Sequence, residues 1–243
     1  MVRRRRSGNT SSRLVSCTAW VNWNLHVSRR MSRSSGIVAI VEGDGDREAV
    51  PSLVRRILQQ CGRYDLQVMA RAIVTKGKPS LLKKFKRHLQ YALNDKCTAI
   101  LVLLDADDEC PRTEVGGLVL KAKSLNLNVP VAIVYAKCEY ETWFICSLSP
   151  GRGDGIRKRL ELPAHVIAPE SPETIRDAKK WLNVRMPHHR SYKGTVDQEP
   201  LTYHIELDLV HSRSRSFRRL YHAIEELVRA VDLGEVTVTP QLD

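Results

Sequence analysis

The sequence of 243 residues is poor in aromatic residues and contains no long hydrophobic run. Phe, Trp and Tyr make up 6% of the chain and are not interleaved with basic residues, which argues against the stacking platform of a single-strand nucleic-acid binder. No apolar run approaches the roughly 20 residues that a membrane helix needs, so we expect no membrane partner. The 42% of hydrophobic residues are nevertheless enough to build a sizeable core.

The sequence also lacks any C-x-x-C pair. Its six cysteines lie at positions 17, 61, 97, 110, 138 and 146, with no regular spacing. This pattern argues against a disulfide framework or a zinc knuckle. A reducing, cytoplasmic location is the simplest expectation.

Acidic residues are missing from the first 35 positions, which contain eight arginines. The net charge of +12 is therefore concentrated there, since the remaining residues carry 31 basic and 27 acidic side chains. The stretch around Cys17 has no continuous apolar segment, so it does not fit an export signal. We predict that residues 1–35 are a disordered basic extension. They could equally result from an assigned start that lies too far upstream, with the true start near Met31. The alternative is a basic arm that tracks phosphates.

From Gly36 onward, strand-like and helix-like patterns alternate. Short apolar segments typical of buried strands occur at 36–43, 66–75, 98–108 and 128–136. Amphipathic helical patterns follow them at 46–62, 78–95, 111–125 and 139–148. This order predicts an α/β domain over residues 36–149, with a mostly parallel four-stranded sheet and helices on both faces.

The last part of the chain, residues 150–243, changes character. Residues 150–210 are rich in Gly, Pro and charge, which predicts a cap or lid packed on the same domain. A helix is expected at 212–231, and the last twelve residues show no pattern. Trp143 and Phe144 are expected in the core.

Acidic residues follow three of the predicted strands. Carboxyl ends of parallel strands meet at one edge of a sheet, where ligands of such folds collect. Carboxylates gathered there repel one another unless a divalent cation such as Mg²⁺ or Mn²⁺ neutralises them. The candidates are Glu42 and Asp46 after the first strand, Asp105 and Asp107 after the third, and Glu139 and Glu141 after the fourth.

Helix capping is the alternative explanation for these acids. Asp46 precedes a helical pattern and has the chemistry of an N-cap residue. Asp108 or Glu109 could cap the helix expected at Pro111 in the same way. Taken together at three strand ends, the acids favour a metal site.

Three segments carry a resemblance to a known fold. VEGDGD (41–46), LLDADD (103–108) and the acid pair after the fourth strand resemble the motifs of the toprim fold of topoisomerases, primases and overcoming-lysogenization-defect nucleases. More closely, the chain from Gly36, including CEYETWF, SYKGTVDQEPLT and SFRRLYHAIEEL, is similar to a bacterial family called domain of unknown function 4276. That family is considered toprim-like and often has an ATPase encoded nearby.

The toprim resemblance implies roles for individual residues. It makes Glu42 the general acid or base, Asp105 and Asp107 metal ligands, and Asp46 the second acid of the first motif. Glu139 and Glu141 both remain candidates for the later acid, with Glu141 slightly favoured. Toprim nucleases commonly carry a lysine near the site. Lys137 and Lys193 are the candidates for this lysine, and neither clearly matches the position that it has in that family.

Such a site predicts phosphodiester chemistry. Two metal ions would support hydrolysis, whereas one metal with Glu42 as proton shuttle would support nicking. A haloacid-dehalogenase-type phosphatase is disfavoured because Glu109 replaces the Thr or Val of its motif, and a dinucleotide site is disfavoured by the acids in GDGDRE. Tyr192 is expected to pack or hydrogen-bond rather than act as a nucleophile.

Two basic runs indicate the partner. Their side chains would neutralise the phosphates of DNA or RNA, although a solvated helix face explains each run as well. We therefore expect a toprim-like metal-dependent nuclease, the effector of a bacterial defence system with an ATPase partner. The alternative is a non-catalytic nucleic-acid-binding or regulatory subunit. The basic candidates are Lys83, Lys84, Lys86 and Arg87 in one run, and Arg213, Arg215, Arg218 and Arg219 in the other.

Overall fold

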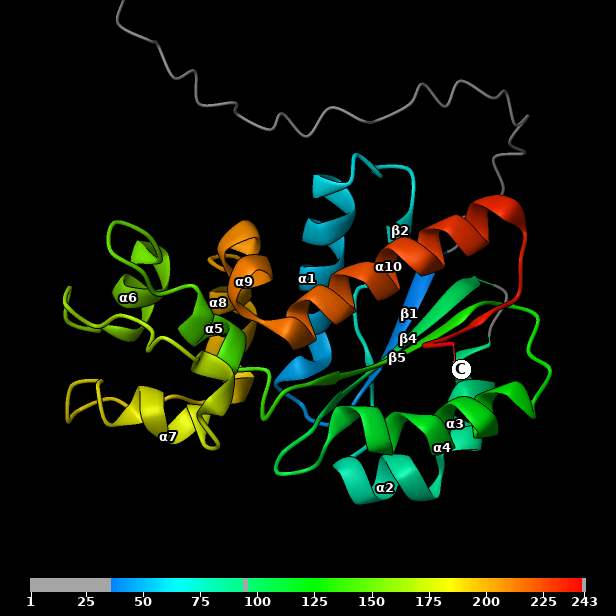
Figure 1. Cartoon of the computed structure of the whole chain (residues 1–243), viewed down its shortest axis with the longest axis horizontal. Coiled ribbons are helices and arrows are strands. Elements are labelled where there is room, and N and C mark those ends of the chain that lie inside the picture. The colour runs from blue at the N-terminus through cyan, green and yellow to red at the C-terminus, as the bar shows by residue number, and fades with distance from the viewer. Residues whose placement is uncertain (1–35, 94–95, 242–243) are drawn as a thin grey trace, which may run out of the picture. The chain divides into compact units, whose positions relative to one another are not determined.

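The computed structural model describes residues 36–93 and 96–241, so the prediction of a disordered basic extension at 1–35 lies outside it. Within these residues the chain forms one parallel sheet in the order β2-β1-β4-β5-β6, with β3 also paired to β1 (Figure 1). The strands are β1 (Gly36–Val41), β2 (Gln67–Val68), β3 (Ile73–Val74), β4 (Cys97–Asp105), β5 (Val131–Ala136) and β6 (Val238–Thr239). The α/β class is confirmed, with six strands instead of four.

The two additional strands have different origins. The predicted strand at 66–75 is divided, because Gly36 pairs with Gln67 whereas Ile40 pairs with Ile73, and the residues between do not keep one register. Strand β6 lies in the last twelve residues, where no pattern was visible, and pairs with Val131 and Ala132. A strand of two residues is too short to show a period.

Helices cover both faces of the sheet. Helices α1 (Asp46–Gln60) and α10 (Arg215–Leu233) lie on one face, and α2 (Lys78–Lys83), α3 (Phe85–Ala92) and α4 (Pro111–Lys123) lie on the other (Figure 1). The helix expected at 78–95 is broken at Lys84, which leaves the helical conformation. Leu81, Phe85 and Leu89 are still buried together beneath the break.

The predicted cap is more helical than its composition indicates. It follows β5 and extends beyond the carboxyl ends of the strands (Figure 1). Its short elements are α5 (Thr142–Cys146), α6 (Asp154–Leu160), η1 (Pro172–Thr174), α7 (Ala178–Asn183), the π-helix η2 (Gly194–Gln198), α8 (Glu199–Thr202) and α9 (Leu207–Arg213).

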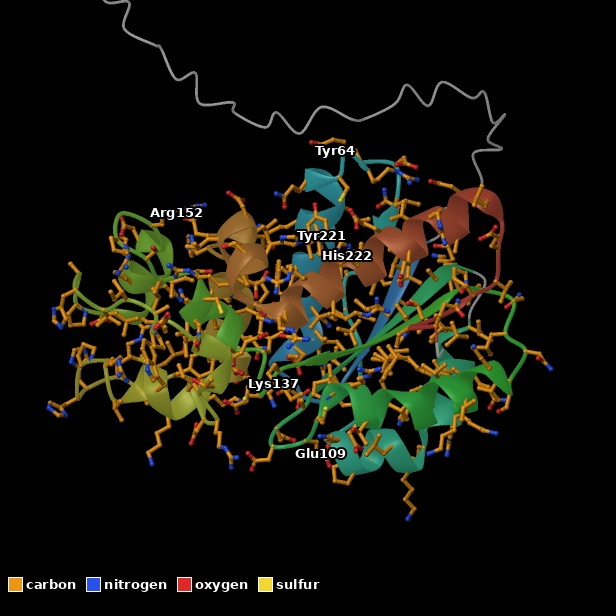
Figure 2. All side chains as sticks on the ribbon, viewed as in Figure 1. Tyr64, Glu109, Lys137, Arg152, Tyr221 and His222 are labelled. Atoms are coloured by element: carbon orange, nitrogen blue, oxygen red, sulfur yellow. The ribbon has the colours of Figure 1, made fainter. Side chains whose placement is uncertain are left out.

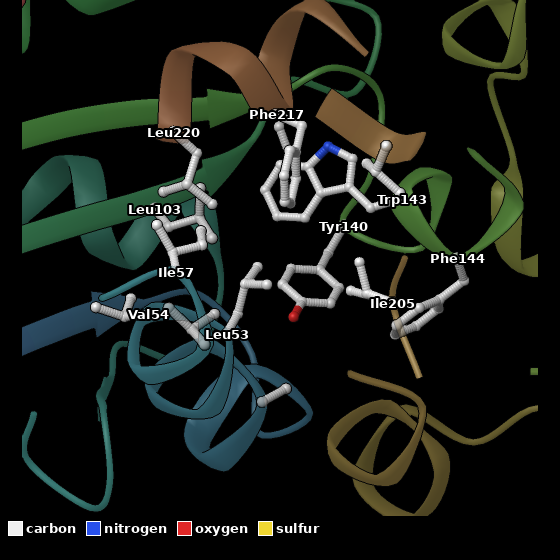
Figure 3. Close-up of a cluster of buried hydrophobic side chains, with 14 of the residues drawn as sticks. Leu53, Val54, Ile57, Leu103, Tyr140, Trp143, Phe144, Ile205, Phe217 and Leu220 are labelled. Carbon is white, nitrogen blue, oxygen red and sulfur yellow. The ribbon is translucent and has the colours of Figure 1, made fainter. Parts of the chain in front are cut away.

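One hydrophobic core joins the cap to the sheet. Trp143 of α5 packs on Tyr140 and on Phe217 of α10, with ring centroids 4.9 and 5.3 Å away (Figure 3). Trp143 and Phe144 are fully buried, as predicted. Leu53 of α1 and Ile205 of the cap belong to the same cluster. The cap is therefore held by the core that holds α1 and α10.

Within the described residues, no helix combines the length and the apolar character that a membrane crossing requires.

Candidate active site

Glu42 follows β1 and lies beside the carboxyl end of β4. Its Oε1 accepts a hydrogen bond from the backbone N–H of Asp105 at 2.9 Å, so the fold fixes the orientation of the carboxylate. Burial raises the pKa of Glu42 to about 7, and the nearby charges of Asp107 and Asp46 add to the rise. Lys78 and the Asp105 N–H act in the opposite direction. Glu42 thus changes its protonation state near neutral pH.

Asp105 is the last residue of β4. Its Oδ1 accepts a hydrogen bond from the backbone N–H of Tyr140 at 2.9 Å, which ties it to the loop after β5. Burial raises the pKa of Asp105 well above its usual value, and the charges of Glu141, Asp46 and Glu42 raise it further. The predicted convergence of acids from three strand ends is therefore present for Glu42, Asp46, Asp105 and Glu141.

Asp46 does not act as the expected N-cap of α1. Its Oδ2 accepts a hydrogen bond from the backbone N–H of Gly43 at 3.1 Å, and its Oδ1 accepts one from the side-chain amide of Gln198 at 2.5 Å. No side chain caps α1. Burial raises the pKa of Asp46 as well. Gln198 belongs to the π-helix of the cap, so the cap contacts the acid cluster directly.

Glu141 is the most deeply buried acid of the cluster, with 2% of its side chain exposed. Its Oε1 accepts a hydrogen bond from the hydroxyl of Tyr192 at 2.9 Å, and its Oε2 lies 3.4 Å from Nζ of Lys179. Burial raises the pKa of Glu141. Tyr192 therefore has the packing and hydrogen-bonding role that was expected of it.

The lysine beside the acids is Lys179, which was not among the predicted residues. Its Nζ forms ion pairs with Glu139 at 2.8 Å and with Glu141 at 3.4 Å. The pKa of Lys179 is raised by the charges of Glu141, Glu139 and Asp105, which outweigh its burial. Of the two lysines offered from the sequence, Lys137 places Nζ 3.5 Å from the Glu109 carbonyl, and Lys193 is exposed.

Glu139 and Asp107 have other partners. Glu139 accepts hydrogen bonds from the first backbone N–H groups of α7, so it caps that helix. Asp107 adopts a positive φ of 52°, which turns the chain away from the strand direction. Its side chain is 62% exposed and pairs with Lys78 at 3.3 Å. The structure therefore does not bring Asp107 together with Asp105.

The two acids that follow Asp107 pair with cations instead of capping α4. Asp108 pairs with Arg176 at 3.0 Å, and Glu109 pairs with Lys78 at 2.5 Å. Helix α4 has no side-chain cap.

The oxygens of Glu42 and Asp105 decide whether a metal ion fits. Among residues 36–93 and 96–241, no three His, Cys, Asp or Glu side chains stand in place to hold an ion by themselves. However, Glu42 and Asp105 each use one carboxylate oxygen for a backbone N–H, and no residue of these two ranges donates a hydrogen bond to the other oxygen. Mg²⁺ is commonly bound by one or two carboxylates together with waters and substrate phosphates. Glu42 and Asp105 therefore offer two oxygens of the kind that Mg²⁺ binds, and any further ligands would have to come from water or substrate.

The two basic runs have different surroundings. Lys83, Lys84, Lys86 and Arg87 are exposed on α2 and α3, and no acid of the described residues pairs with them.

In the second run, three arginines hold the fold. Arg213 donates to the carbonyls of Cys146 and Leu148, Arg218 donates to carbonyls at the end of α9, and Arg219 contacts Thr239 and Glu226. Arg215 is exposed.

Searches of curated proteins and of solved structures each give no match. A family model does match: the one described as Domain of unknown function (DUF4276) covers residues 41–225, which run from the last residue of β1 through the acid cluster and the cap into α10. The match extends over more than half of the chain, and the protein therefore belongs to this family.

Proposed function

We propose that the protein is a toprim-like, Mg²⁺- or Mn²⁺-dependent nuclease that hydrolyses phosphodiester bonds of DNA or RNA. The observation that supports this most is the pair formed by Glu42 and Asp105. Each is oriented by one backbone N–H and keeps its second oxygen without a protein donor in the described residues, at the carboxyl edge of the sheet. Asp46 and Glu141 lie beside them and raise the pKa of Asp105.

The residues of the site have separable tasks in this proposal. Glu42 and Asp105 would hold the metal ion, which would supply activation of a water and stabilisation of the leaving oxygen of the phosphodiester. Without a metal ion Glu42 has a pKa of about 7, and a bound cation would favour its charged form. Lys179 holds Glu141 and Glu139 in place through its ion pairs, and Gln198 holds Asp46.

The substrate is proposed from charge. The exposed lysines of α2 and α3 follow β3, whose end lies beside Glu42, since the backbone N–H of Gly77 donates to the Glu42 carbonyl at 2.9 Å. The basic surface thus begins near the edge of the sheet where Glu42 lies, and its cations would neutralise phosphates there. We further propose a cytoplasmic location, an ATPase protein as partner, and a role as the effector of a bacterial defence system.

The proposal is tested by incubating the full chain with supercoiled plasmid, single-stranded DNA and RNA. Cleavage of at least one substrate is expected with Mn²⁺ or Mg²⁺, and none with EDTA. The Glu42→Gln variant should lose this cleavage while it retains the wild-type circular dichroism spectrum. Wild-type protein that leaves all three substrates intact with either metal would contradict the proposal.

A non-catalytic nucleic-acid-binding or regulatory subunit is the second candidate. The observation that favours it is the exposed basic surface formed by Lys83, Lys84, Lys86 and Arg87, with which no acid among the described residues pairs. In this case the protein binds DNA or RNA without cutting it. Substitution of the four basic residues by alanine would then abolish binding, and Glu42→Gln would leave binding unchanged.

A further inference from the structure

A concave site lies beside the part of β5 that follows its pairing with β6. It is a cleft of about 810 Å³, within the range of ~300–1,000 Å³ that is typical of small-molecule sites. Its walls come from residues 108–115, 133–137, 170–174 and 213–219, together with Pro240. Glu42, Asp46, Asp105 and Glu141 do not line it. Glu109 and Lys137, at its rim, lie near the carboxyl end of the sheet (Figure 2).

Three cationic side chains from three segments line this cleft without a carboxylate partner in the described residues. Arg112 lies in the first turn of α4, Lys137 follows β5, and Arg215 begins α10. Arg112 and Arg215 are exposed, and Lys137 has only a long contact of 3.5 Å to the Glu109 carbonyl. Three unpaired cations around one cavity attract an anion.

The acids at the rim do not cancel this charge. Asp108 and Glu109 are paired with Arg176 and Lys78, neither of which lines the cleft. Glu173 accepts hydrogen bonds from the backbone N–H groups of Arg215 and Ser216, so its charge is stabilised at the N-terminus of α10.

The remaining acid at the rim is Glu170, which is exposed. Its carboxylate faces water, so it opposes the three cations less than a buried charge would.

The floor of the cleft is apolar. Val115, Ile133 and Val134 contribute hydrophobic side chains, and Pro172 and Pro240 add further apolar surface. Tyr135 also lines the cleft, and its buried hydroxyl has no hydrogen-bond partner in the described residues. Tyr135 is 4% exposed. A ligand that suits these walls has both an anionic group and an apolar or planar part.

We propose that this cleft binds a phosphate monoester carried on a planar or apolar group, the chemistry of a nucleotide. The phosphate lies among Arg112, Lys137 and Arg215, and the planar group lies against the apolar part of the lining, which includes Val115, Pro172 and Pro240. Such a group can belong to a free nucleotide or to the 5′-phosphorylated end of a nucleic acid. The cleft is a site in addition to the proposed nuclease centre and does not depend on it.

Calorimetric titration of the full chain in EDTA tests this proposal, because removal of divalent cations prevents phosphate capture by the acid cluster. Adenosine monophosphate is expected to bind measurably, and adenosine and inorganic phosphate to bind at least about tenfold more weakly, since each lacks one of the two parts. The Asp105→Asn variant should bind the nucleotide as wild type does. Loss of nucleotide binding in that variant would overturn the assignment to this cleft.

Charge-reversal variants locate the site. Lys137→Glu and Arg215→Glu should each weaken binding of adenosine monophosphate about tenfold or more, because each removes a charge-assisted contact. Lys121→Glu makes the same charge change at an exposed position of α4 outside the cleft and should leave the affinity unchanged. The proposal is overturned if all three variants bind alike, or if wild type shows no binding at millimolar nucleotide.

Competition separates the two sources of the phosphate. Displacement of the nucleotide by a 5′-phosphorylated oligonucleotide, and not by its unphosphorylated form, supports the proposal and identifies a nucleic-acid end as a ligand. No displacement by either oligonucleotide supports a free nucleotide. Equal displacement by both would show binding of any polyanion and would overturn the proposal.

Discussion

Glu42 combines burial with a carboxylate oxygen that lacks a protein donor. A buried carboxylate is unfavourable in its charged form, and in the unfolded chain the same group titrates at its ordinary, lower pKa. Because the folded pKa is raised, folding stability falls as pH rises from the ordinary value to about 7, and it is constant above that. The site therefore lowers the stability of the protein at neutral pH.

Replacing Glu42 by glutamine should remove this effect. Gln keeps an oxygen that can accept the hydrogen bond from Asp105 but never carries a charge. We expect Glu42→Gln to match wild type in free energy of unfolding near pH 4.5 and to exceed it above pH 7. Urea unfolding at several pH values measures the difference. A variant that is less stable than wild type at pH 8 would contradict the burial argument.

At this scale the sequence predicts some of the site residues and misses others. Glu42 and Asp105 end strands with clear apolar patterns, so their convergence follows from the parallel sheet. Asp107 was expected beside Asp105, but the alternation of an extended strand ends at Asp105, and the positive φ of Asp107 directs it to Lys78. Lys179 has no local signal, because only tertiary packing of α7 brings it to Glu141.

Among the elements, the π-helix η2 has the closest contact with the acid cluster. A Cβ atom on Gly45 would lie 3.0 Å from the carbonyl carbon of Gly194 and would overlap Oε1 of Gln198. The absence of a side chain at Gly45 therefore lets η2 approach α1. This approach brings the side-chain amide of Gln198 within hydrogen-bonding distance of Asp46.

The Gly45→Ala substitution should push η2 away from α1. Gly45 has an ordinary helical φ of −62°, so alanine fits the backbone, and any loss comes from its overlap with Gln198 and its close approach to the backbone of Gly194. We expect a destabilisation of about 1–3 kcal/mol in urea unfolding, as for other overpacked sites. The proposed cleavage activity should fall as well.

The control for this substitution is Gly117→Ala in α4. A Cβ at Gly117 meets no atom within 4 Å, and alanine is the better helix former, so a gain of about 0.5–1 kcal/mol is expected. Equal changes in the free energy of unfolding for the two substitutions would show that the contact between η2 and Gly45 does not affect stability.

The elements with long apolar patterns were predicted well, and the short ones were not. Strands β1, β4 and β5 and helices α1, α4 and α10 lie close to their expected ranges. Residues 150–210 were expected as an irregular lid, but several short helices form there. Helices of four to seven residues contain too few turns to display a helical period, and tertiary packing stabilises them instead.

At the scale of the whole molecule, the cap and the sheet share their core. Trp143 lies between Tyr140 and Phe217, and its indole N–H donates to Oγ of Ser216 at 3.2 Å. The cap therefore cannot separate from α10 without exposing this aromatic cluster (Figure 3). Gln198, Tyr192 and Lys179 belong to this cap, so the shared core helps to position them.

Removal of the Trp143 side chain should destabilise the whole protein. We expect Trp143→Ala to lower the free energy of unfolding by about 3–5 kcal/mol, the usual cost of truncating a large buried aromatic residue. Trp181→Ala is the control, because Trp181 is partly exposed on α7 and stacks on Arg185. Urea unfolding followed by circular dichroism measures both. A smaller loss for Trp143→Ala than for Trp181→Ala would contradict a common core.

The most direct test of the proposed centre compares two neighbouring aspartates in one cleavage assay with Mn²⁺. Asparagine at position 105 keeps the hydrogen bond to Tyr140 but loses the charge, whereas asparagine at position 107 suits the positive φ and alters only an exposed carboxylate. We predict that Asp105→Asn lowers the cleavage rate about a hundredfold or more, and that Asp107→Asn stays within about threefold of wild type. A variant pair in which Asp107→Asn is inactive and Asp105→Asn retains the wild-type rate would contradict this account.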